Sequence, residues 1–219
     1  MHTIEDGTGR AAPPGLRERK KRRTRDTLIR SALELFALKG FDGTTVDEIS
    51  EAADVSQRTF FRYFANKEEV ALAVQDSVES FFFARLRERP AAEAPLTALR
   101  NAVLASWDSV GEAIESVVPL ELHMRTYRMI ESTPQLFAAH LHRLARLEEE
   151  LAREIARREG LDVRTDPRPQ VLVAAFGGVM RVTGKLWGER GNAGLEELRK
   201  ITTRYLDQLG PALAENWRN

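Results

Sequence analysis

The amino-acid sequence predicts an all-α protein with a small N-terminal three-helix unit and a larger helical region behind it. Apolar residues recur three or four positions apart along most of the 219 residues, a spacing that places them on one face of an α-helix. Ser, Thr, Asn, Pro and Gly stand where such stretches begin and end, as they do at helix caps. The alternation of apolar and polar residues that marks a half-buried β-strand is nowhere indicated.

The N-terminus is predicted to be a disordered tail over residues 1–16. This segment contains Gly and Pro and has too little apolar side chain to offset the entropy lost on ordering. It lacks the apolar core of a signal peptide, and no stretch of the chain approaches the length of a membrane span. We therefore expect a cytoplasmic protein without a membrane partner.

Charge is balanced over the whole chain but concentrated near its start. The 33 basic and 33 acidic residues cancel, whereas RERKKRRTR, residues 17–25, has seven basic residues and one acidic residue. Such runs are often only solvated. Here the run leads into the predicted three-helix unit, where Arg22 and Arg23 are candidates for an arm that follows a phosphate backbone or enters the minor groove of DNA.

The first helix is predicted from about Arg22 to Lys39. Apolar residues recur at helical spacing from Leu28 to Phe36, and Gly40 suits the end of the helix. We expect this helix to pack on the two short helices that follow it.

The stretch from Thr44 to Lys67 predicts a helix-turn-helix. Thr45 stands three residues before Glu48, the spacing of a capping box, so a helix should begin at the next residue. Polar residues typical of turns follow about two helical turns later. Among them Ser56 is a good N-cap for a second short helix, predicted over residues 57–64.

The second of these helices has a composition typical of DNA-reading helices. Phe60 and Phe64 share the face that a core needs, which leaves the polar residues for other faces. Gln and Arg make bidentate contacts to adenine and guanine from the N-terminal end of a recognition helix. The alternative is that the arginines only solvate an ordinary helical hairpin. The candidate contacts are Gln57 and Arg58 to bases with Thr59 nearby, Thr45, Ser56, Tyr63 and Lys67 to phosphates, and Arg62 on the same helix.

The segment ALELFALKGFDGTTVDEISEAADVSQRTFFRYFANKEEV resembles the N-terminal DNA-binding domain of the TetR family of bacterial transcriptional regulators. The resemblance extends from about Arg22 to Leu72. The residues that match the family pattern are Ala32, Leu35, Phe36, Gly40, Phe41, Thr44, Thr45, Ile49, Ala52, Ala53, Val55, Ser56, Thr59, Phe60, Tyr63, Phe64, Lys67 and Glu68. Two positions depart from it. The family often has Gly where Arg58 stands and Tyr where Phe61 stands, and Phe lacks the hydroxyl that could bond a phosphate.

The rest of the chain is predicted to be helical as well. Asn66 offers a further N-cap, and a long helix should run from Lys67 to Arg89, before a linker at residues 91–95. Further helices are predicted over residues 96–110, 111–118, 120–131, 134–159, 166–188 and 194–217. We expect the helix-turn-helix domain to comprise residues 17–66 and an effector-binding and dimerisation domain to comprise residues 67–219.

This C-terminal region resembles TetR-family regulatory domains, in which the last two helices of each subunit form a four-helix dimer interface. The resemblance implies a homodimer through residues 166–188 and 194–217. A helix-turn-helix dimer reads two half-sites related by its own symmetry, so double-stranded DNA with a palindromic operator is the expected partner. Core packing within one chain is the competing explanation for the apolar stripes of these helices.

Residues 123–134 and 143–156 are similar to the regulatory domain of actinobacterial TetR-type proteins associated with acyl-CoA-like ligands. Such a ligand needs an apolar tunnel for its chain and cations for its phosphates. The alternatives are that the aromatic residues are core and that the arginines pair with Glu121 or Glu131 on the surface. The candidate effector contacts are Trp107, Met124, Tyr127, Phe137 and Phe176 for the tunnel, and Arg125, Arg128 and His140 for the charge.

The sequence indicates no enzyme, metal site or cofactor. It has no cysteine and no HExxH pattern, and His140 and His142, two apart on a helix, diverge in direction. GERGNAG, residues 188–194, follows a helix and lacks the glycine spacing of a dinucleotide-binding loop. We predict a TetR-type transcriptional repressor that is released by a small apolar or acyl-CoA-like effector. A helical protein-interaction module without DNA binding is the alternative, and the sequence leaves open whether an effector releases or promotes DNA binding.

Overall fold

A computed structural model describes residues 15–190 and 194–214, and the regular structure within these ranges is helical. The helices are α1 (Leu16–Lys39), α2 (Val46–Ala52), α3 (Gln57–Tyr63), α4 (Lys67–Ala71), α5 (Ala73–Arg87), α6 (Pro95–Glu115), α7 (Leu120–Ser132), α8 (Pro134–Glu159), α9 (Arg168–Glu189) and α10 (Leu195–Ala214). The predicted all-α fold is confirmed. Most of the predicted disordered tail, residues 1–14, lies outside the described residues, as do residues 191–193 and 215–219.

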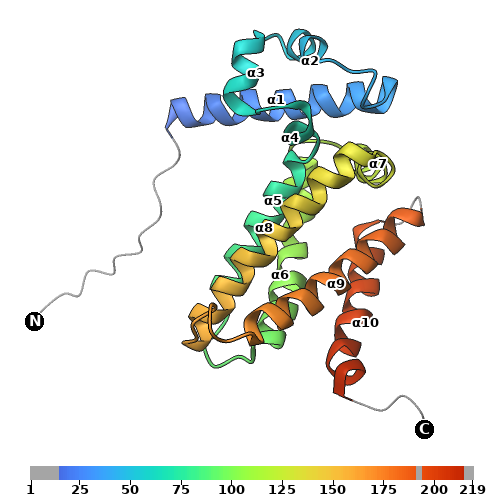
Figure 1. The fold of residues 1–219 in the computed structure, drawn as a ribbon. Coiled ribbons are helices and arrows are strands. Elements are labelled where there is room, and N and C mark those ends of the chain that lie inside the picture. The colour runs from blue at the N-terminus through green and yellow to red at the C-terminus, as the bar shows by residue number, and fades with distance from the viewer. Residues whose placement is uncertain (1–14, 191–193, 215–219) are drawn as a thin grey trace, which may run out of the picture.

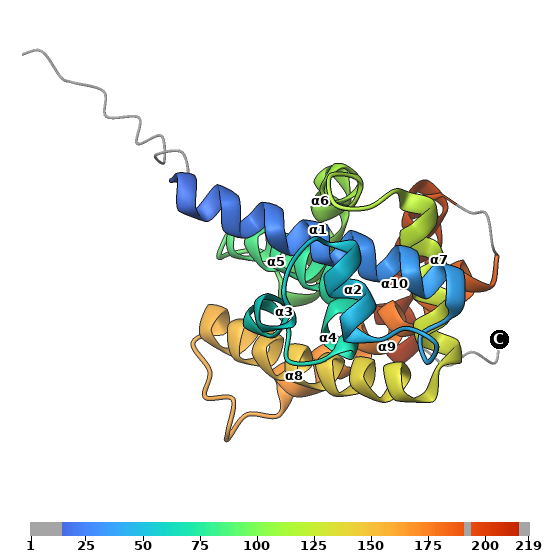
Figure 2. The same ribbon diagram turned by 90° about the horizontal axis from the view of Figure 1, so that it is seen from above.

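Helices α1, α2 and α3 lie together across one end of the longer helices (Figure 1). Leu28, Ile49 and Phe60, one from each helix, are fully buried in their common core. The same core cluster continues into α6 and α7 through Ile114 and Ile130. Seen from above, α1 runs over α5, and its C-terminal end lies beside α7 (Figure 2). The helix-turn-helix is therefore packed directly on the region that follows it.

Local caps fix the two short helices as the sequence predicts. The Thr45 hydroxyl accepts a hydrogen bond from the backbone N–H of Glu48 at 3.3 Å, and the Glu48 carboxylate accepts from the N–H of Thr45 at 2.9 Å. Ser56 Oγ accepts from the N–H of Thr59 at 3.2 Å at the start of α3. Asn66 caps α4 in the same way. These bonds satisfy backbone donors that a helix start leaves unpaired.

The predicted start of the first helix was wrong, because α1 begins at Leu16 and not at Arg22. The basic run at 17–25 is thus helical from its first residue. Arg and Lys favour helices, and neither Gly nor Pro interrupts the chain between Leu16 and Lys39. Glu18 also lies in the first turn, where a negative charge is favourable.

Two other helix boundaries differ from the prediction. The single helix expected from Lys67 to Arg89 is broken at Leu72, whose buried side chain belongs to the helix-turn-helix core. Conversely, the helices expected at 96–110 and 111–118 are one helix, α6. A Cβ at Gly111 would lie 3.2 Å from Leu195 of α10, so this glycine serves close helix approach and does not end the helix.

A second core cluster joins α5, α6, α8, α9 and α10 around Leu86, Leu99 and Ile155. Helix α8 has the predicted bounds and ends at Gly160, whose φ of 65° is in the left-handed region that favours glycine. Among the described residues, no helix has both the length and the apolar character that crossing a membrane requires.

Candidate nucleic-acid interface and effector site

Helix α3 turns one face into the core and presents another to solvent. Phe60 is fully buried and Phe64 nearly so, with ring centroids 5.7 Å apart. Gln57 and Arg58 are exposed at the N-terminal end of α3, as a base-reading role requires. Phe61 shares their side of the helix, one turn further on, and is 52% exposed.

Phe61 is the functional candidate that the sequence alone did not provide. The sequence marked this position only as a Phe that lacks the phosphate-binding hydroxyl of Tyr. The structure exposes its ring beside Gln57 and Arg58. An apolar ring on this face can contact the methyl group of thymine.

The turn before α3 combines a left-handed residue with a backbone hydrogen bond. Asp54 has a φ of 52°, a left-handed conformation that Asp tolerates better than most residues. The next N–H, that of Val55, donates to the carbonyl of Ser50 at 3.0 Å. The angle between α2 and α3 is therefore set by backbone geometry, as a recognition helix requires.

The hydroxyls expected near phosphates are engaged inside the protein. Thr45 also lies 3.2 Å from the Glu48 carboxylate through its hydroxyl, and Ser56 Oγ lies 3.1 Å from Thr59 Oγ1. Thr45, Ser56 and Thr59 thus shape the two helix starts. Their contact with DNA stays a prediction.

Lys67 is also engaged by the protein itself. Its ammonium donates to the carbonyls of Phe41 at 2.8 Å and Thr44 at 3.1 Å, and lies 4.2 Å from the centre of the Phe41 ring. This ties the turn after α1 to the start of α4. An ammonium has three N–H donors, so one remains for a phosphate.

The remaining cations lie on α3 and α1. Arg62 is exposed, with its guanidinium 5.2 Å from the centre of the half-buried Tyr63 ring. Arg22 and Arg23 are exposed on the first turns of α1, which project beyond α3 in both views (Figures 1 and 2). The expectation of a basic arm is corrected here, because a helix presents these charges at fixed positions.

The structure does not gather the eight candidate effector residues around one cavity. Met124 and Phe176 are buried, and the Phe176 ring stacks on Phe82 with centroids 6.0 Å apart. Trp107 is half-buried between the two core clusters. Tyr127 meets Trp187 edge to face at 6.0 Å. These contacts favour the core interpretation of the aromatic residues.

The charged candidates lie elsewhere, and Phe137 is 37% exposed on α8. Arg125 pairs with Glu121 at 2.8 Å, which is the surface pairing that the sequence left open. Arg125 and Arg128 line a groove of about 300 Å³ between α7 and the end of α1. The apolar and cationic halves of the predicted site are therefore separate in this structure.

Two buried histidines lie on α7 and α8. Burial lowers the pKa of His123 to about 4, and burial together with the charge of Arg143 lowers the pKa of His140 to about 4. Nδ1 of each ring has no hydrogen-bond partner, and neither has either amide atom of Gln75. Buried polar atoms are nearly always satisfied, so these neutral groups are candidates for contact with a bound molecule. His123 and Gln75 had no sequence signal that set them apart from core residues.

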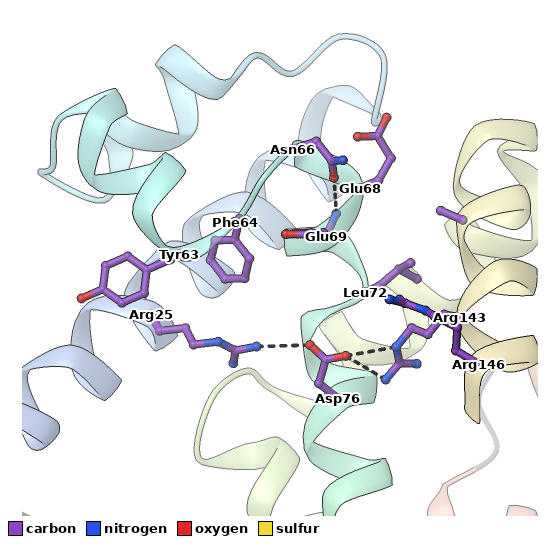
Figure 3. Close-up of a pocket in the computed structure, with 11 residues that line it drawn as sticks. Arg25, Tyr63, Phe64, Asn66, Glu68, Glu69, Leu72, Asp76, Arg143 and Arg146 are labelled. Carbon is purple, nitrogen blue, oxygen red and sulfur yellow. Dashed lines mark hydrogen bonds and ion pairs between the residues drawn. The ribbon is translucent and has the colours of Figure 1, made fainter. Parts of the chain in front are cut away.

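A further cavity of about 320 Å³ lies where α3 and α4 meet α5 and α8 (Figure 3). Three arginines line it, Arg25, Arg143 and Arg146, together with the carboxylates of Glu68, Glu69 and Asp76. None of the eight predicted effector residues lines this cavity. The sequence could not predict it because its residues come from five separate helices, α1, α3, α4, α5 and α8.

Comparison with known families gives matches over both parts of the chain. Residues 28–74 match the family model described as bacterial regulatory proteins of the tetR family. Residues 93–214 match the model described as the MftR C-terminal domain.

Individual relatives agree with these matches. The HTH-type transcriptional regulator TcmR of Streptomyces glaucescens is 47% identical over 205 residues, 94% of this chain and 91% of the relative. The protein called MftR of Mycobacterium tuberculosis is 31% identical over 163 residues, 71% of this chain and 75% of the relative. These similarities confirm the prediction of a transcriptional regulator and not an enzyme, and they do not support the alternative of an interaction module without DNA binding.

Solved structures share the fold. A complex of SmeT with triclosan has a TM-score of 0.58 at 19% sequence identity, and the alignment covers 87% of this chain and 91% of the SmeT chain. FadR of Thermus thermophilus in complex with lauroyl-CoA has a TM-score of 0.52 at 22% sequence identity, and the alignment covers 88% of this chain and 96% of the FadR chain. At these identities the likeness is one of fold.

Proposed function

Because the chain belongs to the TetR family of bacterial transcriptional regulators, we propose that it is a repressor that binds a palindromic operator as a homodimer. One observation carries the DNA half of this proposal. Helix α3 is held by the buried Phe60 and by a capped N-terminus, while Gln57 and Arg58 at that end are free to face a major groove.

The contacts divide by chemistry. Gln57 and Arg58 read base edges, and Phe61 packs on a thymine methyl group. Arg22 and Arg23, on the projecting turns of α1, neutralise phosphates and add affinity without sequence preference.

The dimer is proposed to form through α9 and α10. Val171 and Val182 on α9 are 65% and 47% exposed, and Leu213 on α10 is 73% exposed. Gly178, which is half-buried, lies seven residues after Val171 and so on the same side of α9. Exposed apolar side chains on α9 and α10 suit a helix-helix contact with a second copy.

The effector is proposed to be a small apolar or acyl-CoA-like molecule that enters the regulatory helices near Trp107. Met124, Tyr127, His140 and Phe176 lie on the neighbouring helices α7, α8 and α9 and supply apolar surface and, at Nδ1 of His140, a neutral polar atom without a partner. An acyl-CoA would place its phosphates at Arg125 and Arg128, in the groove between α1 and α7. Binding there would change the position of α1 against α7.

The DNA role is tested by selecting bound duplexes from a random pool with the purified full-length protein. We expect an enriched palindrome, and Arg58→Ala should weaken binding to it by about 1–3 kcal/mol and relax specificity at one base pair of each half-site. Arg153→Ala is the matched control, an exposed arginine on α8 that is ion-paired with Glu149. Equal affinity of the Arg58 and Arg153 variants would contradict the assignment of α3.

The effector proposal is tested by repeating the binding with dodecanoyl-CoA, dodecanol or CoA alone. Release by dodecanoyl-CoA only would support the acyl-CoA class, and release by dodecanol as well would support a small apolar effector. Loss of the dodecanoyl-CoA response in Arg128→Gln, with the response to dodecanol kept, would support a phosphate site in the groove. A palindrome insensitive to all three compounds would remove the proposed effector class and keep the DNA role.

A further inference from the structure

Asp76 joins the DNA-binding unit to the regulatory region (Figure 3). It lies in the first turn of α5, and its carboxylate accepts hydrogen bonds from arginines on two other helices. Arg25 of α1 donates to Oδ2 at 3.3 Å, and Arg143 of α8 donates to Oδ1 at 3.0 Å through Nε. We call these three residues the Asp76 junction. A single carboxylate thus links the helix that carries the basic run to the longest regulatory helix.

The α8 side of the junction is strongly constrained. The Arg143 side chain is only 9% exposed, and it also pairs with Glu79 at 2.8 Å. A buried arginine is costly unless its charge stays paired. If α8 shifts, Arg143 must therefore carry its partners with it or exchange them.

The α1 side reaches the recognition helix. The guanidinium of Arg25 lies 5.4 Å from the centre of the Phe64 ring, and Phe64 directly follows α3. Arg25 therefore holds Asp76 with one end of its guanidinium and packs on the end of α3. Movement of Asp76 relative to α1 would therefore move the Arg25 guanidinium and change its contact with the end of α3.

The cavity beside the junction gives these side chains room for a second arrangement. Glu68 and Glu69 of α4 line the same cavity of about 320 Å³, and Arg146 also borders it. The Glu69 carboxylate already accepts the N–H of Ala65 at 2.7 Å, so Glu68 is the carboxylate to which an arginine can move without displacing packed apolar side chains. Ion pairs that can form in two alternative arrangements define an equilibrium between two states. Binding at either of two separate sites can shift such an equilibrium.

The position of Arg143 connects the junction to the proposed effector region. His140 lies three residues before Arg143 and so on the same face of α8. We propose that the Asp76 junction couples the effector region to the DNA-binding unit, holding α1 and α3 in the DNA-binding arrangement until α8 moves. This rests on the proposed function, because it concerns the regulation of that DNA site.

Coupling is reciprocal, so operator DNA must act on α8 if α8 acts on DNA binding. The test measures amide hydrogen exchange over residues 140–147 of the full-length protein, with and without the duplex selected from the random pool. We expect the wild type to change its exchange rates there by about fivefold or more on binding DNA. In Asp76→Asn, which keeps the shape and removes the charge, the change should fall below about twofold, since coupling of this size needs the shared carboxylate.

Two further variants make the test specific. Arg25→Gln leaves the buried Arg143 paired with Asp76 and Glu79, so it keeps the α8 side intact and should lose the same response. Asp207→Asn removes a comparable interhelical pair, with Arg100 at 2.7 Å, that joins α10 to α6. It should keep the wild-type response.

The outcomes separate the two proposals. Absence of DNA binding by the wild type would overturn the proposed function and with it the junction. Normal DNA binding with no change at residues 140–147, or with a wild-type change in both Asp76→Asn and Arg25→Gln, would overturn the junction and leave the DNA role in place.

Discussion

The buried imidazole of His123 makes a quantitative prediction about stability and pH. Burial lowers its pKa from 6.5 to about 4, so the unfolded chain binds a proton more readily than the folded protein. The stability that this group contributes is complete above pH 6.5 and is lost as the pH falls toward 4. Between pH 7.5 and 5.5 the linkage relation gives a loss of about 1 kcal/mol from this one group.

The variant His123→Asn removes the titrating group and keeps a polar side chain. The assay is the free energy of unfolding in urea at pH 7.5 and pH 5.5, at one protein concentration because a dimer's stability depends on it. The difference between the two pH values should be smaller in the variant than in the wild type by about 1 kcal/mol. His142→Asn is the control, because His142 is an exposed histidine on α8. This variant should show the same difference in unfolding free energy between the two pH values as the wild type.

The comparison with the wild type is needed because other groups titrate in the same range. His140 acts in the same direction as His123, since burial lowers its pKa to about 4. Glu79 acts in the opposite direction, because burial raises its pKa to about 7 and its contribution is lost as the pH rises through 7. Only the difference between variant and wild type isolates His123. The same pH dependence in both would refute the burial of a neutral imidazole at this position.

Further predictions concern the DNA-binding unit. Lys67→Met leaves the carbonyl of Thr44 without its side-chain donor and leaves the carbonyl of Phe41 with only the N–H of Thr44, at 3.3 Å, so the free energy of unfolding should fall by about 1–3 kcal/mol. If the third N–H of Lys67 meets a phosphate, the slope of log affinity against log salt should also fall by about one, and an unchanged slope would exclude that contact. Thr45→Ala removes the cap of α2 and should lower the free energy of unfolding by about 1 kcal/mol. An unchanged free energy of unfolding would show that the capping box does not stabilise the protein. Replacing both Arg22 and Arg23 by Gln should reduce the salt slope by about two without altering the selected operator; a changed operator would mean that they read bases.

The helix-turn-helix could be predicted from the sequence because its signals are local. The capping box of α2 and the N-cap of α3 each involve residues three apart, and both form as expected. The start of α1 was missed because a run of charges resembles a solvated tail, although no residue in it stops a helix. The break at Leu72 depends on burial of that side chain in a core made by other helices, which no local signal reveals.

The effector site was harder to predict for the same reason. Aromatic residues at helical spacing are compatible with both a pocket and a core, and the structure packs Phe176 and Tyr127 against partners from other helices. Arg125 forms an ion pair with Glu121, one turn away on the same helix. The unsatisfied polar atoms of Gln75 and His123 are visible only once tertiary packing is known.

Two kinds of contact hold the DNA-binding unit on the regulatory region, and they differ in what they can transmit. The apolar core runs without interruption from Leu28 to Ile114 and Ile130, but apolar burial is non-directional and tolerates small sliding of packed helices. The Asp76 junction is directional, because each guanidinium binds a carboxylate in a defined geometry. The core therefore supplies non-directional stability. The orientation of α1 and α3 depends on Arg25 and Asp76, together with Arg30 of α1, whose Nε donates to the carbonyl of Val117 at 3.0 Å. A variant that breaks the junction should accordingly leave the protein folded while it uncouples the two parts.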